Sequence, residues 1–222
     1  MTTRKRPLNQ CAIALDGPAA SGKSSVARRV ADALGVPYVS SGLLYRAATY
    51  LALRQGVSLT DEDALVHALN EREIELVAIP GEPNHVRVSG QVLADALLHS
   101  DTVDASVSRV AKHPRVRAWV DDRLRELGGT FVVEGRDMGT AVFPDAAHKF
   151  YLSAPAEVRA ARRVGERAAD LTEVAAALER RDTLDAEQLR PAPDAQHLDT
   201  RDLDLDGVVA WVLGRLEPLG RD

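Results

Sequence analysis

The length of 222 residues allows one domain with an insertion or two small domains. The formal net charge of −5 argues against a dedicated nucleic-acid binder, which would be basic. A single cysteine excludes an internal disulfide, and no segment reaches the roughly 18 apolar residues that span a bilayer. The basic start is followed by only a short apolar stretch, so we expect no signal peptide and a soluble, cytoplasmic protein.

The first predicted strand, Ala12–Leu15, leads into Gly17-Pro-Ala-Ala-Ser-Gly-Lys-Ser24, which fits the pattern G-x-x-x-x-G-K-[S/T]. Such a loop before a helix points successive backbone N–H groups at one anion. We therefore predict a nucleoside triphosphate site, in which Lys23 reaches the β- and γ-phosphates and the Ser24 hydroxyl is a ligand of Mg²⁺. The residues predicted to contact this nucleotide are Gly17, Pro18, Ala19, Ala20, Ser21, Gly22, Lys23, Ser24, Ser25 and Arg162.

Along the rest of the chain, β-rich segments alternate with helical ones. The predicted strands are Ala12–Leu15, Tyr38–Val39, Phe131–Val133, Phe150–Ser153 and His197–Asp199, and the predicted helices cover 22–34, 43–55, 114–127, 155–181 and 204–217. This alternation predicts a parallel sheet with helices on both faces, and ligands bind at the carboxyl ends of such strands. We expect Asp16, Ser40-Ser41, Glu134–Asp137 and Thr200, which follow those ends, to border one crevice.

The region from 62 to 107 breaks the alternation. It contains Glu73–Ala78, the turn Pro80-Gly-Glu-Pro-Asn84 and the alternating segment His85–Ser89, which together predict an antiparallel hairpin or small sheet with flanking helices. We interpret residues 62–107 as a subdomain inserted into a core formed by residues 1–61 and 108–222.

Two further segments favour a second anion site. In Ser41-Gly-Leu-Leu-Tyr-Arg46, the arginine lies in the first turns of a predicted helix, where it would face a second phosphate or simply lie on the helix surface. In Phe131-Val-Val-Glu-Gly-Arg-Asp-Met-Gly139, Arg136 and Asp137 follow a buried strand. They form either a salt-bridged turn or a site in which Arg136 bridges donor and acceptor phosphates during in-line transfer.

Four motifs together resemble the bacterial cytidylate kinases, from about residue 11 to residue 213. They are Asp-Gly-Pro-x-x-x-Gly-Lys-Ser at 16–24, Ser-Gly-x-x-Tyr-Arg at 41–46, Pro-Arg-Val-Arg at 114–117 and Glu-Gly-Arg-Asp-Met-Gly-Thr-x-Val-Phe-Pro at 134–144. The last motif distinguishes this family from shikimate and adenylate kinases, which share only the loop. The resemblance implies an α/β nucleoside monophosphate kinase fold, with a three-layer core around a five-stranded parallel sheet. It also implies an enlarged acceptor-binding insert, a short lid at about 159–171, and transfer of the γ-phosphoryl group of ATP to CMP or dCMP.

The resemblance also implies an acceptor site made of Ser41, Arg46, Ser108, Arg117, Arg136, Asp137, Arg181 and Asp185. Arg46 and Arg136 would bind phosphate and act with Lys23 in catalysis, while Arg181 and Asp185 would hold the sugar hydroxyls. Asp137 would accept a hydrogen bond from the cytosine amino group, and Ser and Arg donors would meet the ring acceptors. Uracil would leave buried polar groups unpaired, so such a site would discriminate against it.

The chain departs from the family pattern in three places. Ser40 stands where an aspartate is common, and Gln188 stands where the family often has an arginine, with Arg190 nearby. The lid segment also looks abbreviated. Its arginines could clamp the phosphates of ATP or form a solvated basic face, and they are Arg159, Arg162, Arg163 and Arg167.

No His or Cys cluster suggests a metal centre built by the protein, so Mg²⁺ would arrive with ATP. We expect a monomer that acts on small molecules by direct in-line transfer, with no nucleic-acid or membrane partner. One alternative is a kinase of the same fold with another acceptor, such as UMP or an alcohol. The other is a P-loop regulator that binds nucleotide and shows only a slow ATPase.

Overall fold

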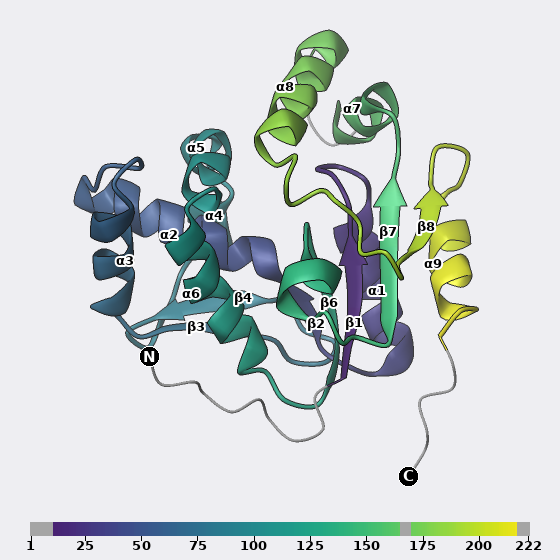
Figure 1. Ribbon diagram of the computed structural model, residues 1–222, viewed down its shortest axis with the longest axis horizontal. Helices are drawn as coiled ribbons and strands as arrows, with labels where there is room; N and C mark the ends of the chain where they lie inside the picture. Colours follow the sequence, from purple (N-terminus) through teal and green to yellow (C-terminus); the bar gives the residue numbers. More distant parts are fainter. Residues whose placement is uncertain (1–10, 165–169, 217–222) are drawn as a thin grey trace.

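The computed structural model describes residues 11–164 and 170–216 (Figure 1). Its centre is a five-stranded sheet in the order β2-β6-β1-β7-β8, in which every neighbouring pair is parallel. The strands are β1 (Cys11–Asp16), β2 (Tyr38–Ser40), β6 (Thr130–Gly135), β7 (His148–Ser153) and β8 (Gln196–Asp199). All five predicted strands lie in this sheet, so the predicted parallel architecture is confirmed.

Helices cover both faces of the sheet, as predicted. They are α1 (Lys23–Leu34), α2 (Ser41–Gln55), α6 (Pro114–Arg125) and α9 (Leu205–Leu213). Two further helices, α7 (Ala156–Val164) and α8 (Leu171–Leu184), pack against each other and not on a face of the sheet. Successive residues of a strand point to opposite faces. In β1, Ile13 and Leu15 pack with α1 and α9 on one face, whereas Ala12 and Ala14 pack with α2 and α6 on the other. Because both faces are covered, the open region of the sheet is the edge where its strands end.

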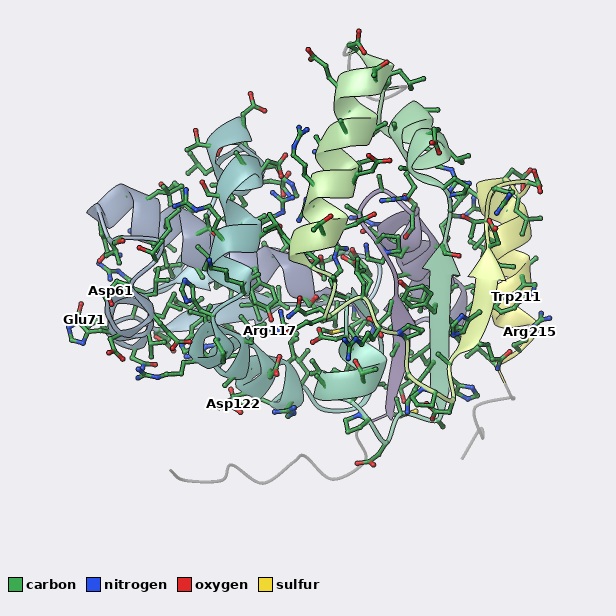
Figure 2. The ribbon with its side chains drawn as sticks, turned by 45° about the horizontal axis from the view of Figure 1, so that its top comes forward. Asp61, Glu71, Arg117, Asp122, Trp211 and Arg215 are labelled. Atoms are coloured by element: carbon green, nitrogen blue, oxygen red, sulfur yellow. The ribbon has the colours of Figure 1, made fainter. Side chains whose placement is uncertain are left out.

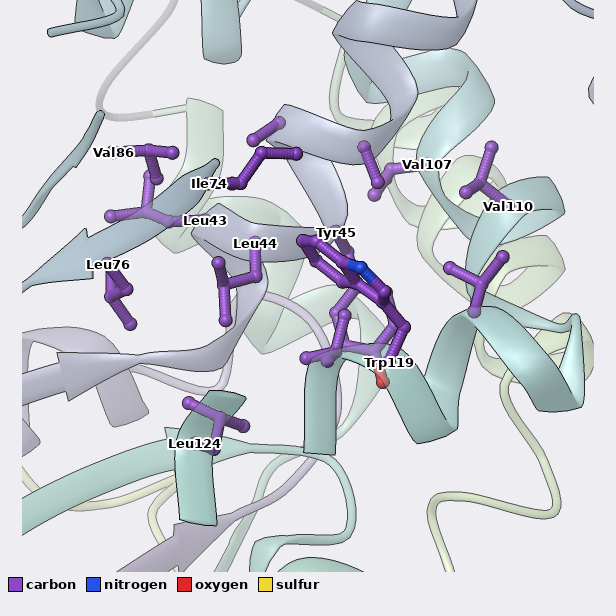
Figure 3. Close-up of a cluster of buried hydrophobic side chains, with 14 of the residues drawn as sticks. Leu43, Leu44, Tyr45, Ile74, Leu76, Val86, Val107, Val110, Trp119 and Leu124 are labelled. Carbon is purple, nitrogen blue, oxygen red and sulfur yellow. The ribbon is translucent and has the colours of Figure 1, made fainter. Parts of the chain in front are cut away.

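A second, antiparallel sheet interrupts the alternation, as expected for residues 62–107. The elements of this region are α3 (Glu62–Asn70), β3 (Ile74–Val77), β4 (His85–Val88), β5 (Gln91–Val92), α4 (Asp95–Leu98) and α5 (Asp101–Ala111). Helix α5 runs across the expected boundary at residue 107. Figure 3 shows Ile74, Leu76 and Val86 in one apolar cluster with Leu44 of α2 and Leu124 of α6. The inserted region therefore shares its hydrophobic core with the helices that border the main sheet.

The expectation of one continuous helix over 155–181 is wrong. Helix α7 is described as far as Val164, and Asp170, which directly precedes α8 at Leu171, has an extended backbone. The carboxylate of Asp170 accepts hydrogen bonds from the backbone N–H groups of Thr172 and Glu173, which fixes the start of α8. Residues 165–169, with the predicted lid arginine Arg167, lie outside the described part of the chain. Figure 1 places α7 and α8 beyond the carboxyl ends of β1 and β7.

The described helices include none that is both long and apolar enough to cross a bilayer.

Candidate active site

The predicted phosphate-binding loop lies between β1, the central strand of the sheet, and α1. Gly17 has a φ of 149°, and a Cβ atom there would lie 2.1 Å from the carbonyl oxygen of Leu152 in β7. Gly22, with a φ of 87°, immediately precedes Lys23, the first residue of α1. Glycine tolerates both conformations, so the loop passes close to β7 and presents the N-terminus of α1 to an anion.

Two cavities, of about 240 Å³ and 620 Å³, border this loop and share several lining residues. Lys23, Ser24 and Arg46 line both of them. The first cavity is lined by all the residues predicted for the acceptor site, namely Ser41, Arg46, Ser108, Arg117, Arg136, Asp137, Arg181 and Asp185. Residues from α2, α5, α6, α8 and the end of β6 thus converge on the phosphate-binding loop.

Most residues predicted to contact the triphosphate also border these cavities. Ala19 lines the first cavity, and the second is lined by Ala20, Ser21, Gly22, Lys23, Ser24, Ser25 and Arg162. Gly17 and Pro18 line neither. Their carbonyl oxygens instead accept hydrogen bonds of 3.1 Å from Arg136 Nη1 and Lys23 Nζ, respectively. These two loop residues therefore orient cationic side chains.

Lys23 is buried at the base of the first cavity. Its ammonium group lies 3.8 Å from Oε2 of Glu134, a buried carboxylate at the end of β6. Burial, followed by the positive charge of Arg136, lowers the pKa of Lys23 from its usual 10.5 to about 8. The site therefore holds a lysine charge that an additional anion would stabilise.

Arg136 and Asp137 each pair with another residue, so the alternative of a salt-bridged turn between them is wrong. Arg136 donates from Nε to Oδ2 of Asp185 at 3.0 Å. Asp137 forms an ion pair with Arg117 of α6. Two neighbouring residues after β6 thus contact opposite parts of the first cavity, one toward α8 and the other toward α6.

Arg117 is fixed from three sides. Besides Asp137, its Nη1 donates to the carbonyl oxygen of Ala111 at 3.1 Å, and its guanidinium lies 5.5 Å from the ring centre of Tyr45. Figure 2 shows Arg117 directed toward the middle of the molecule, whereas Asp122 of the same helix points to the outside. Asp121 lies close to this pair, and its burial, followed by the charge of Asp137, raises its pKa to about 6.

The two residues predicted for the sugar site lie at the end of α8. Arg181 Nε is 3.8 Å from Oδ2 of Asp185. Burial, followed by the charge of Arg136, lowers the pKa of Arg181 to about 10. Gln188 lines the first cavity, whereas Arg190 is exposed and lines neither cavity. Of these two residues, only Gln188 therefore borders the cavity that the predicted acceptor residues line.

The three described arginines of α7 have different environments, and none of them lies on a fully solvated face. Arg159 is buried and donates to the carbonyl oxygens of Ala154 and Ala19 and to Asp182. Arg162 lines the second cavity and donates to both oxygens of Thr200. Arg163 lines both cavities.

The expected crevice after the strand ends needs one correction. Ser40, Ser41 and Glu134–Asp137 line the first cavity and Thr200 lines the second, but Asp16 lines neither. Its carboxylate accepts hydrogen bonds of 2.8 Å from the backbone N–H groups of Met138 and Gly139. Burial raises the pKa of Asp16 to about 6 despite these bonds. Asp16 thus holds the segment that carries Arg136 and Asp137.

Comparison with known proteins decides the family. A family model described as cytidylate kinase matches residues 13–217. The chain belongs to the cytidylate kinase family. Cytidylate kinase from Thermus thermophilus is 57% identical to it over 204 residues, which are 92% of this chain and 97% of that protein. Cytidylate kinase from Deinococcus radiodurans is 52% identical over 92% of this chain and 98% of its own length. The one from Geobacillus kaustophilus is 43% identical over 90% and 94%.

The cytidylate kinase resemblance read from four motifs is thus confirmed, and with it the prediction of a kinase. Our predictions placed Glu134 at the crevice without a role in it, and they gave His99 and Asp104 no place in the site. Glu134 accepts a 2.7 Å hydrogen bond from Ser40 Oγ and lies beside Lys23. His99 lines both cavities, and Asp104 lines the second. His99 and Asp104 belong to the inserted region, where the sequence predicts elements but not which of their faces point toward the loop.

Proposed function

We propose that the chain transfers the γ-phosphoryl group of ATP to CMP or dCMP by direct in-line displacement. The observation that carries this proposal is the convergence of the acceptor-site residues on Lys23 and Ser24 in one cavity. A triphosphate on the loop and a monophosphate beside Arg136 would have their phosphates next to each other. Such positioning is the main contribution of a protein to phosphoryl transfer.

The chemistry needs positive charge more than it needs a base. An ionised phosphate is already a nucleophile, so no side chain has to remove a proton from it. Lys23, Arg46 and Arg136 would neutralise the charge that spreads over the transferred group. Arg136 is suited to bridge both substrates, because it is anchored to the phosphate-binding loop through Gly17 and to α8 through Asp185.

The donor set fits Mg²⁺ bound with ATP. Ser24 and Glu134 line the first cavity and offer hydroxyl and carboxylate oxygens, which this hard cation prefers. Ser24 would bind the ion directly and Glu134 would hold its water ligands. When bound, Mg²⁺ supplies charge neutralisation on the β- and γ-phosphates. The apolar side chains of Leu203, Leu205 and Val208 line the second cavity and would contact the adenine base.

The base of the acceptor would be selected by charge and hydrogen bonding around Arg117. The Asp137 carboxylate accepts from an amino group, and the guanidinium of Arg117 donates to ring acceptors, which matches cytosine. Uracil would face two mismatched pairs in a buried site. A mismatch of this kind is a strong source of discrimination.

We further propose that the inserted region, residues 62–107, belongs to the acceptor site and that the chain is a cytoplasmic monomer. Sedimentation equilibrium tests the oligomeric state, and a dimer at micromolar concentration would contradict it.

The experiment that tests this function is a coupled ADP-release assay with ATP and, in parallel, CMP, dCMP, UMP, AMP and shikimate. We expect CMP to give the highest rate, dCMP to follow closely and shikimate to give none. Turnover that no acceptor stimulates would favour a nucleotide-binding regulator, and UMP as the best acceptor would favour a different kinase of this fold.

A further inference from the structure

Asp104 of α5 lies between arginines from two other helices. Its Oδ1 forms a 2.6 Å ion pair with Arg46 Nη1 of α2, and its Oδ2 accepts a 3.4 Å hydrogen bond from Arg163 Nη2 of α7. The side chains of Asp104 and Arg46 are each 15% exposed. One carboxylate therefore links three helices that are distant in the sequence.

This cluster lies where the two cavities meet. Arg46 and Arg163 line both cavities, and Asp104 lines the second. Taken alone, a carboxylate beside two anion sites would repel both ligands. Its presence there is explained by its partners, because two half-buried guanidinium groups repel each other unless an anion lies between them.

Arg46 also donates a 3.0 Å hydrogen bond from Nη1 to the carbonyl oxygen of Leu98. This contact and the ion pair with Asp104 both come from the inserted region, α4 and α5. Within the described part of the chain, Asp104 connects Arg46 to α7, because it pairs with both Arg46 and Arg163. A displacement of α7 would thus reach the acceptor arginine through the carboxylate of Asp104.

We propose that Asp104 is a positioning residue that couples the donor site to the acceptor site. A nucleotide whose phosphates contact Arg163 fixes the position of that side chain, and the Asp104 carboxylate then holds Arg46 in the orientation that receives the phosphate of the acceptor. The inference rests on the proposed function, since it takes a nucleoside triphosphate and a pyrimidine monophosphate as the two ligands. By thermodynamic reciprocity, the acceptor tightens donor binding by the same factor.

The test is a calorimetric titration of the full chain with CMP, alone and saturated with a non-hydrolysable ATP analogue and Mg²⁺. The coupling factor is the ratio of the two dissociation constants. In the wild type we expect a factor of about five or more. In Asp104→Asn, which keeps the shape and removes the charge, we expect a factor near one. Arg163→Gln should lose the coupling in the same way, which keeps the test decisive if the first variant does not fold.

Asp63→Asn is the matched control, because it removes a carboxylate from an ion pair with Arg115 that is exposed and lines neither cavity. It should keep the wild-type factor. A coupling factor of one in the wild type would overturn the proposal while leaving the kinase function intact. So would a coupling factor in Asp104→Asn or Arg163→Gln that equals the wild-type value. A wild type that binds no CMP under either condition would instead contradict the proposed function, and this inference with it.

Discussion

Arg136 donates from Nε to Asp185 Oδ2 at 3.0 Å and from Nη1 to the Gly17 carbonyl oxygen at 3.1 Å. The first bond joins the segment after β6 to the end of α8, and the second joins it to the phosphate-binding loop. One guanidinium group thus fixes the distance between the predicted sugar site and the predicted triphosphate site. This arrangement makes Arg136 the most informative residue to replace.

We expect Arg136→Ala to lower kcat by about 10²–10³, as for the loss of one transition-state donor. Steady-state ADP release with saturating ATP and CMP measures the effect. Arg54→Ala is the control, because Arg54 is an exposed arginine at the end of α2 that bonds only within its helix, to Tyr50, in the described contacts. A kcat of Arg136→Ala within twofold of the wild type would remove Arg136 from the mechanism.

Asp137→Asn tests the selection of the base. The amide keeps one acceptor oxygen, but its NH₂ group faces either Arg117 or the cytosine amino group, both of which are donors. We expect the ratio of kcat/KM for CMP to that for UMP to fall by about 10²-fold. The measurement is a pair of kcat/KM determinations with the two acceptors. An unchanged ratio would show that Asp137 has no part in reading the base.

Gly17→Ala tests the close approach between the loop and β7. The new Cβ would lie 2.1 Å from the Leu152 carbonyl oxygen, so the loop must move. We therefore expect a loss of about 3 kcal/mol in the free energy of unfolding, together with weaker ATP binding. The control Gly81→Ala separates the cost of the steric collision from the cost of the backbone conformation. Gly81 has a φ of 75°, and a Cβ atom added there would have nothing within 4 Å, so this variant should lose only about 1 kcal/mol. Urea unfolding measures both variants. Equal losses of unfolding free energy in Gly17→Ala and Gly81→Ala would show that the close approach to β7 does not contribute to the cost.

The lowered pKa of Lys23 predicts an alkaline limit to activity. Folding favours the neutral amine, so in the free protein the lysine loses its charge as the pH rises through about 8, well below the usual 10.5. A neutral Lys23 binds the triphosphate poorly, and kcat/KM for ATP should fall about tenfold per pH unit above that value. The bound triphosphate stabilises the charged form, so the limit in kcat should lie at higher pH. A kcat/KM profile that is flat to about pH 10 would contradict the assignment.

Local motifs and strand alternation predict the fold and the edge of the sheet at which the site lies, because both depend on short-range patterns. The family resemblance alone supplied Ser108, Arg117, Arg181 and Asp185. The loop motif predicts the turn between β1 and α1, and the segments that follow strand ends predict Ser41, Arg136 and Asp137 at one edge of the sheet. The break between α7 and α8 also has a local signal that our prediction did not use, namely Asp170 ahead of Glu173 as a helix cap.

Pairing between distant segments has no comparable signal. Arg159 and Arg163 lie on one short helix, yet the first is buried against Asp182 and the second reaches Asp104 in the inserted region. Helical spacing predicts only that they lie near each other. Likewise, Asp16 lies at the carboxyl end of its strand as Glu134 does, but its carboxylate accepts hydrogen bonds from the backbone of Met138 and Gly139. The partner that each of these side chains takes depends on the packing of the whole fold.

The most direct test of two facing anion sites is the binding of a bisubstrate analogue, adenosine and cytidine joined at their 5′ ends by five phosphates. If one cleft holds both nucleotides with their phosphates adjacent, this molecule occupies both cavities at once, and its dissociation constant should be at least about 10²-fold below that of ATP or CMP alone. Affinity no tighter than that of ATP alone would place the two sites apart and contradict the proposed transfer.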